Sequence, residues 1–434
     1  MSCICPRFST KLLDGLLIKL YKYKNSTITK LGKNTNKIKR VEHTSMYVTR
    51  PLSLYKKSPE LLQSPTIEGP YSGYLVVHDE DTTPTCLGLS HGGVSLIELP
   101  FPSNKLLNIK DYGPFQHLVF VVPILDQPLS SNRYYVIKAH KKHKGEAYSC
   151  SKEENRGMSS IDDNKPRHLF PNNIYHQFEF SQTITCNNNN TFTAKSIASD
   201  GHVPRFLRNI PSIQIHKSTP IPNNLILNSA KGLDKVLRSR YPSFDFPITR
   251  VSSDAVCVGK WVCPFMFIFD GELGYQVKNS MYYEMSLEQT WERIFTSDNN
   301  LANNNNHNNN KVMIDVVVPI QEFKIGGKDG VIDSRKCDGN VVWFRTIGSV
   351  GEERSVGLST MIVERMIWEQ KRVGWVNNEK QVRVVREEEY GGIGWWVRFG
   401  CFVLVERFVL RRMDGSLVFT CDFKHTQEIR TKWE

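Results

Sequence analysis

Stretches rich in valine, isoleucine, phenylalanine and tyrosine recur along the chain, and each is bounded by glycine, proline, asparagine or aspartate. Runs of this kind predict β-strands. We expect strands at residues 73–78, 118–122, 134–139, 175–185, 255–269, 312–323 and 341–346. They do not alternate regularly with helical segments, so the pattern favours antiparallel sheets over a doubly wound parallel sheet.

The clearest hairpin is predicted late in the chain. Segments 402–411 and 417–424 flank Asp414 and Gly415, a pair that supplies the positive backbone angles of a tight turn. Between residues 417 and 424, apolar side chains at odd positions alternate with mostly polar ones at even positions. This alternation predicts one buried face and one hydrated face.

Three amphipathic helices are also predicted. A helix at 286–295 would begin with a capping box, Ser286 to Gln289, and a helix at 359–372 would pair Arg365 with Glu369 one turn apart. A third, at about 229–240, would bury Val236 and end before a proline. The expected fold class is therefore α+β, with strand-dominated antiparallel sheets and a few packed amphipathic helices.

The chain has 434 residues, 40% of them hydrophobic, which is enough for a packed core. No apolar run reaches the length of about 18 residues that a membrane-spanning helix needs. We expect a basic, disordered or targeting extension at 1–45 and a strand-rich region at 46–298. An asparagine-rich loop at 299–310 would lead to an α+β region at 311–434 that packs on the preceding one.

The formal charge of +12 is concentrated at the start of the chain, where residues 1–45 hold ten basic and two acidic side chains. Leucines between residues 12 and 20 fall on one face of a basic helix. Such a segment could bind an anionic membrane surface, act as an organelle presequence, or have no role. The expected location is cytoplasmic or nuclear, or a mitochondrion or chloroplast if the segment is a presequence.

One basic cluster stands out in the remainder of the chain, which is nearly neutral. It follows a predicted strand and could bind a phosphate or sulfate, although a solvated hairpin tip is the alternative. Arg205 and Arg208 would supplement it only if the fold brought them close. The candidate anion-binding residues are Lys138, His140, Lys141, Lys142, His143 and Lys144.

Catalytic and metal-binding patterns are weak. Ser349, Asp422 and His425 occur in the order of a hydrolase triad, but the residues around Ser349 lack the first glycine of the GxSxG motif. The ten cysteines contain no CxxC pair, so zinc-site spacing is absent. We therefore assign no catalytic residue, no metal site and no cofactor, and leave the question of enzyme activity open, leaning against it.

Eight blocks of the chain are distinctive: MYVTRPLS (46–53), EGPYSGYLVV (68–77), HKGEAYSCSKEE (143–154), AKSIASDGHVPRFLR (194–208), VGKWVCPF (258–265), YEMSLEQTW (283–291), VERMIWEQKRVGW (363–375) and residues 399–434. Together and in this order they resemble a plant-specific family, domain of unknown function twelve-sixty-two, over about residues 46–434. The resemblance implies a plant source and one continuous unit, and it brings no substrate or catalytic residue.

We therefore expect a soluble, non-enzymatic interaction or binding protein of plant cells, with a role in stress or defence. A protein partner is favoured, together with an anionic surface that residues 1–45 would contact. No sequence-specific nucleic-acid motif is present. The alternatives are an enzyme of unrecognised type and a peripheral binder of anionic lipid.

Overall fold

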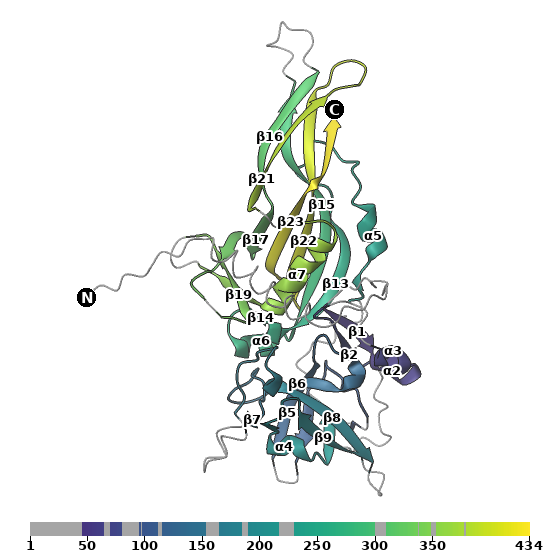
Figure 1. Ribbon diagram of the computed structural model, residues 1–434, viewed down its shortest axis with the longest axis vertical. Coiled ribbons are helices and arrows are strands. Elements are labelled where there is room, and N and C mark those ends of the chain that lie inside the picture. The colour runs from purple at the N-terminus through teal and green to yellow at the C-terminus, as the bar shows by residue number, and fades with distance from the viewer. Residues whose placement is uncertain are drawn as a thin grey trace, which may run out of the picture. The chain divides into compact units, whose positions relative to one another are not determined.

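Antiparallel strands make up most of the described fold, which confirms the strand-dominated prediction (Figure 1). The helical share is smaller than an α+β class implies. The basic extension at 1–45 and nearly all of the asparagine-rich loop at 299–310 lie outside the described residues. The computed structural model describes residues 46–64, 70–79, 95–96, 98–111, 115–152, 165–184, 190–216, 230–299, 310–336, 338–348, 353–376 and 379–434.

Within these ranges, one sheet has seven strands in the order β3–β11–β4–β5–β6–β8–β9, all paired antiparallel. Its core includes Phe101, Phe178 and Phe192, each fully buried. The strands are β3 (Ser95–Leu96), β4 (Leu107–Lys110), β5 (Gln116–Pro123), β6 (Arg133–Lys138), β8 (Gln177–Ile184), β9 (Asn190–Ser196) and β11 (Ser212–Ile215).

A second sheet has ten described strands in the order β12–β13–β15–β22–β23–β17–β18–β19–β20–β14. It joins strands from both sides of residues 299–310. The strands are β12 (Gly232–Leu233), β13 (Val256–Pro264), β14 (Ile268–Phe269), β15 (Tyr282–Asp298), β17 (Gln321–Ile325), β18 (Lys328–Ile332), β19 (Val341–Thr346), β20 (Ser355–Ser359), β22 (Arg398–Arg412) and β23 (Leu417–Trp433).

Three smaller strand pairs and several short helices complete the described elements. The pairs are β1 (Tyr47–Pro51) with β2 (Gly73–Val77), which run parallel, β7 (Ser151–Lys152) with β10 (Gly201–His202), and β16 (Lys311–Pro319) with β21 (Gln381–Glu389). The α-helices are α2 (Leu52–Lys57), α3 (Glu60–Gln63), α4 (Arg205–Arg208), α5 (Lys235–Arg240), α6 (Leu273–Asn279) and α7 (Thr360–Arg372). The 3-10 helices are η1 (Leu129–Ser131), η3 (Ile174–His176) and η5 (Phe265–Phe267). None of the described helices is long and apolar enough to cross a bilayer.

The predicted helix at 286–295 is wrong, because this segment lies inside the 17-residue strand β15. Leu287 and Trp291 are four residues apart, which fits one face of a helix and also one face of a strand. Met285 and Gln289 are buried as well, and so are Ser286 and Thr290 on the other face, so the strand is largely covered on both faces. Pairing with β13 on one edge and β22 on the other satisfies the backbone of β15 and selects the strand.

The hairpin of β22 and β23 confirms the turn predicted at Asp414 and Gly415. Gly415 has a φ of +83°, and the Asp414 carboxylate accepts a hydrogen bond from the Ser416 amide at 2.9 Å. The predicted hydrated face of β23 is wrong, since Asp422 and Lys424 are both buried. Ion pairs make their burial tolerable, because each charge has a partner within hydrogen-bonding distance.

These partners come from other strands of the same sheet. Arg407 of β22 donates from Nε to Asp422 Oδ1 at 2.7 Å, and Lys424 Nζ donates to Glu292 Oε1 of β15 at 2.7 Å. Asp422 and Lys424 are therefore accommodated in the interior by partners that sequence alternation alone does not reveal.

Helix α5 differs from the helix predicted at 229–240. It begins at Lys235, after Asp234 caps it by accepting the Leu237 amide at 2.9 Å, and residues 217–229 lie outside the described ranges. Val236, predicted to be buried, is 62% exposed, while Arg238 points inward. An inward charge on this helix requires acidic partners.

A buried ionic cluster supplies them and joins α5, α7 and β22. Arg238 donates from Nε to Glu406 Oε1 at 2.8 Å and from Nη1 to Glu369 Oε2 at 3.2 Å. Arg365 donates from Nη2 to Glu369 Oε1 at 2.7 Å, which confirms the pairing predicted on α7. Burial acts to raise the pKa of Glu406, but the hydrogen bonds and charge of Arg238 outweigh burial and lower it.

We predict that Arg238→Met lowers the free energy of unfolding by about 3–5 kcal/mol, because it leaves two buried carboxylates short of a partner. Urea denaturation of the full chain measures this change. Arg240→Met is the matched control, since Arg240 is exposed on the same helix, and it should change stability by less than about 0.5 kcal/mol. Equal effects of the two substitutions would contradict a structural role for the cluster.

Candidate functional site

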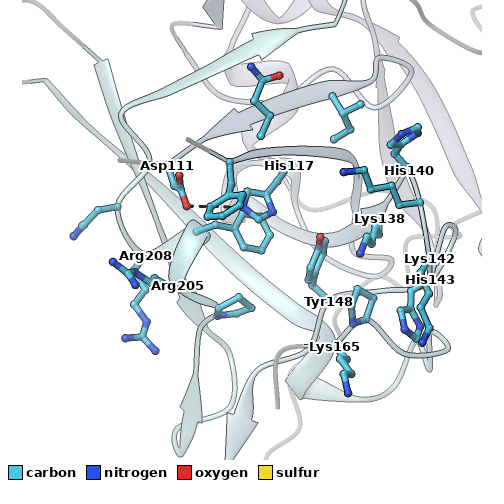
Figure 2. A pocket seen from close by; sticks show the side chains of 18 residues that line it. Asp111, His117, Lys138, His140, Lys142, His143, Tyr148, Lys165, Arg205 and Arg208 are labelled. Carbon is cyan, nitrogen blue, oxygen red and sulfur yellow. Dashed lines mark ion pairs between the residues drawn. The ribbon is translucent and has the colours of Figure 1, made fainter. Parts of the chain in front are cut away.

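A hollow of about 1230 Å³ opens where the ends of three neighbouring strands meet (Figure 2). In an antiparallel sheet, the end of one strand lies beside the start of the next. The end of β4 therefore lies beside the start of β5, and the start of β5 lies beside the end of β6. This topology gathers the basic cluster that follows β6 and the polar residues at the start of β5 around one space.

The loop after β6 is closed by backbone hydrogen bonds, and residues 140–142 at its tip are exposed. The Gly145 amide donates to the Lys138 carbonyl at 2.7 Å, and His143 Nδ1 lies 2.7 Å from Glu146 Oε2. Lys141 and His143 both have a left-handed backbone, with φ of +60° and +65°. Non-glycine residues rarely adopt this conformation, and clusters of such residues are typical of functional loops.

Helix α4 brings a second group of cations to the hollow. The ring of Phe206 stacks on His117 of β5 with centroids 4.0 Å apart, and it packs edge-on against Tyr148 at 4.8 Å. These ring contacts anchor α4, so that Arg205 and Arg208 at its two ends line the same hollow.

Most of the predicted anion-binding residues line this space: Lys138, His140, Lys141, Lys142 and His143. Lys144 belongs to the same loop but does not line the hollow. Arg205 and Arg208 do join the cluster, as the prediction required. Sequence reasoning missed Lys165, because no local pattern marks this residue. Lys165 lies two residues before Arg167, and the isolated strand bridge between Ala147 and Arg167 brings it to the hollow.

The hollow is strongly cationic. Six lysine and arginine side chains line it in the described part of the chain, against a single carboxylate, that of Asp111. Burial lowers the pKa of His117 despite the charge of Asp111 3.9 Å away, which favours a neutral imidazole at neutral pH. Burial raises the pKa of Tyr148 to about 12, so its hydroxyl stays protonated. The positive charge of the hollow therefore comes mainly from lysine and arginine.

The residues considered for a hydrolase triad are not brought together, and no metal site is formed by the described residues. Ser349 lies outside the described residues, and Asp422 and His425 project from opposite faces of β23, the first to Arg407 and the second to Gln370 of α7. Among the residues that the structure describes, no group of histidine, cysteine, aspartate or glutamate is arranged to hold a metal ion.

Comparison with known proteins supports the family resemblance over part of the chain. Residues 68–160 match the family described as "Protein of unknown function (DUF1262)". A search of curated proteins finds no match. Among solved structures, the chain is similar to the "Crystal structure of Cry35Ab1", with 12% identity and a TM-score of 0.44 over 77% of this chain and 90% of that chain.

We predict that Gly145→Ala destabilises the protein by about 2–4 kcal/mol, since it combines a left-handed backbone with overpacking. Gly145 has a φ of +90°, and an added Cβ would lie 2.7 Å from Leu273 and 2.8 Å from Val277 of α6. Gly271 is the matched control, because it has a φ of +78° and nothing lies within 4 Å of an added Cβ. Gly271→Ala therefore measures the cost of the left-handed backbone alone, a loss of about 1–2 kcal/mol in the free energy of unfolding. Urea denaturation should separate the two variants, and equal losses would show that the loop does not press on α6.

Proposed function

We propose that this protein is a non-enzymatic binding protein whose cationic hollow takes a phosphate-bearing anion. The observation that carries the proposal is the convergence of six lysine and arginine side chains on one space that, among the described residues, is lined by a single carboxylate. They come from the loop after β6, from Lys165 and from α4, which are far apart in the sequence. Clustered lysine and arginine side chains are the usual means of binding phosphate.

Several of the cations that line the hollow are available to a bound anion. Among the described residues, Lys138, Lys141, Lys142 and Arg205 form no ion pair with a carboxylate. Two residues of the loop also hold the left-handed conformation. Backbone strain that persists at one place in a fold favours a binding role for that place.

The chemistry of the lining favours binding over catalysis by a serine, threonine or cysteine nucleophile. Over the described residues, no serine, threonine or cysteine faces the hollow. His117 is engaged by stacking on Phe206 instead of being poised beside a nucleophile. An enzyme of unrecognised type remains the alternative, and acid–base catalysis by Asp111 and His117 is the form that it would take.

Several expectations from the sequence remain predictions beside this proposal. They are the plant-cell setting, the role in stress or defence, the protein partner, the cellular location, and the contact of residues 1–45 with an anionic surface. The cationic hollow adds to these expectations a proposed class of ligand, a phosphate-bearing anion.

Titration calorimetry of the full chain with sodium tripolyphosphate tests the proposal. We predict that the double variant Lys142→Glu, Arg205→Glu weakens binding by at least about tenfold, because it removes two charge-assisted contacts and adds repulsion. Both side chains are exposed, so the fold should be unaffected.

The matched control is the double variant Lys57→Glu, Lys195→Glu. Both lysines are exposed and lie outside the hollow, and the change in net charge is the same. This control should weaken binding by less than about twofold. If the two double variants weaken binding equally, affinity follows net charge and the hollow is not the site.

A further inference from the structure

Aromatic groups lie inside the same cationic hollow, where an inorganic anion would make no use of them. Phe115 lines the hollow with 69% of its side chain exposed. The stacked rings of His117 and Phe206 are nearly parallel, at an interplanar angle of 15°. Phe206 is only 6% exposed and supports the His117 ring, which is 26% exposed, so the aromatic surface open to a ligand comes mainly from Phe115. An exposed aromatic face of this kind binds planar rings.

The positive charge is divided between two sides of these rings. In Figure 2, Arg205 and Arg208 lie on one side of His117, while Lys138, Lys142 and their neighbours lie on the other. Tyr148 lies between His117 and the lysine side. A ligand that fills the hollow therefore meets cations, then aromatic surface, then cations again.

We infer that the hollow binds a segment of single-stranded nucleic acid, with a base on the aromatic surface and backbone phosphates on both cationic flanks. This inference rests on the proposed function. A basic groove with aromatic stacking platforms is the general means of binding single strands without sequence preference. It is consistent with a chain that carries no sequence-specific nucleic-acid motif.

Two related ligands fit the arrangement less well. A mononucleotide carries its phosphates on one side of the base, so it would leave one cationic flank unoccupied. A duplex keeps the faces of its bases stacked on one another, which prevents contact with Phe115. The volume of about 1230 Å³ also exceeds what one nucleotide would fill.

Fluorescence anisotropy with two labelled probes separates stacking from charge. One probe is a single-stranded thymidine oligonucleotide of about 12 nucleotides, and the other is an abasic strand of the same length and charge. Measured on the full chain at about 0.1 M salt, the thymidine strand should bind at least about tenfold more tightly. Residues 1–45 contribute charge to both complexes, so the ratio of the two affinities reports on the bases.

Phe115→Ala should weaken binding of the thymidine strand by about five- to tenfold and leave the abasic strand unchanged. Phe115→Trp should preserve the preference, since it keeps a stacking ring. Tyr275→Ala is the matched control, because Tyr275 is 60% exposed and lies outside the hollow, and it should alter neither affinity.

The outcomes of these experiments test the single-strand inference separately from the anion-binding proposal on which it rests. Equal binding of the two strands, no effect of Phe115→Ala, or displacement by thymidine monophosphate at the same nucleotide concentration would overturn the single-strand assignment. If Lys142→Glu, Arg205→Glu still weakened both strands in that case, the anion-binding proposal would stand. If this double variant weakened neither strand, both would fail.

Discussion

The buried ionic cluster of Arg238, Glu369, Glu406 and Arg365 is the constraint on which the arrangement of α5, α7 and the ten-stranded sheet depends. Removing these charges from water is unfavourable unless every partner is in place. Helix α7 therefore packs where its Glu369 meets Arg238 of α5, at 3.2 Å. Arg365 also donates to the Pro70 carbonyl at 2.9 Å, so the same helix fixes the segment that precedes β2.

The cationic hollow is supported by the same framework through α6. Gln276 of this helix donates to the Ile268 carbonyl and to the Tyr283 hydroxyl, both at 2.8 Å, which ties α6 to β14 and β15 of the larger sheet. Its apolar side chains press against Gly145, in the loop that carries Lys141 and Lys142. Affinity at the hollow should thus depend on packing in a sheet that contributes no lining residue.

Local sequence patterns were sufficient where an element's partners are near in the chain, as in the β22–β23 hairpin. They failed for β15, because Leu287 and Trp291 satisfy both helical and strand periodicity and only distant strands decide between the two. The same contrast between local patterns and long-range pairing holds at the cationic hollow. Charge density alone revealed the cluster at 138–143, whereas Lys165 and the stacked pair of His117 and Phe206 reach the hollow through long-range pairing that no local pattern encodes.

The pairing of β15 with β22 also governs the order in which the sheet can assemble. Asp298 and Arg398, which face each other at one end of this pairing, are 100 residues apart, while β22 and β23 are joined by one short turn. Contacts near in sequence form first, because closing a long loop is entropically slower. As the chain emerges from the ribosome, one edge of β15 waits with its backbone groups unpaired until β22 has been made. During that interval the nascent protein presents a long open strand edge to other chains.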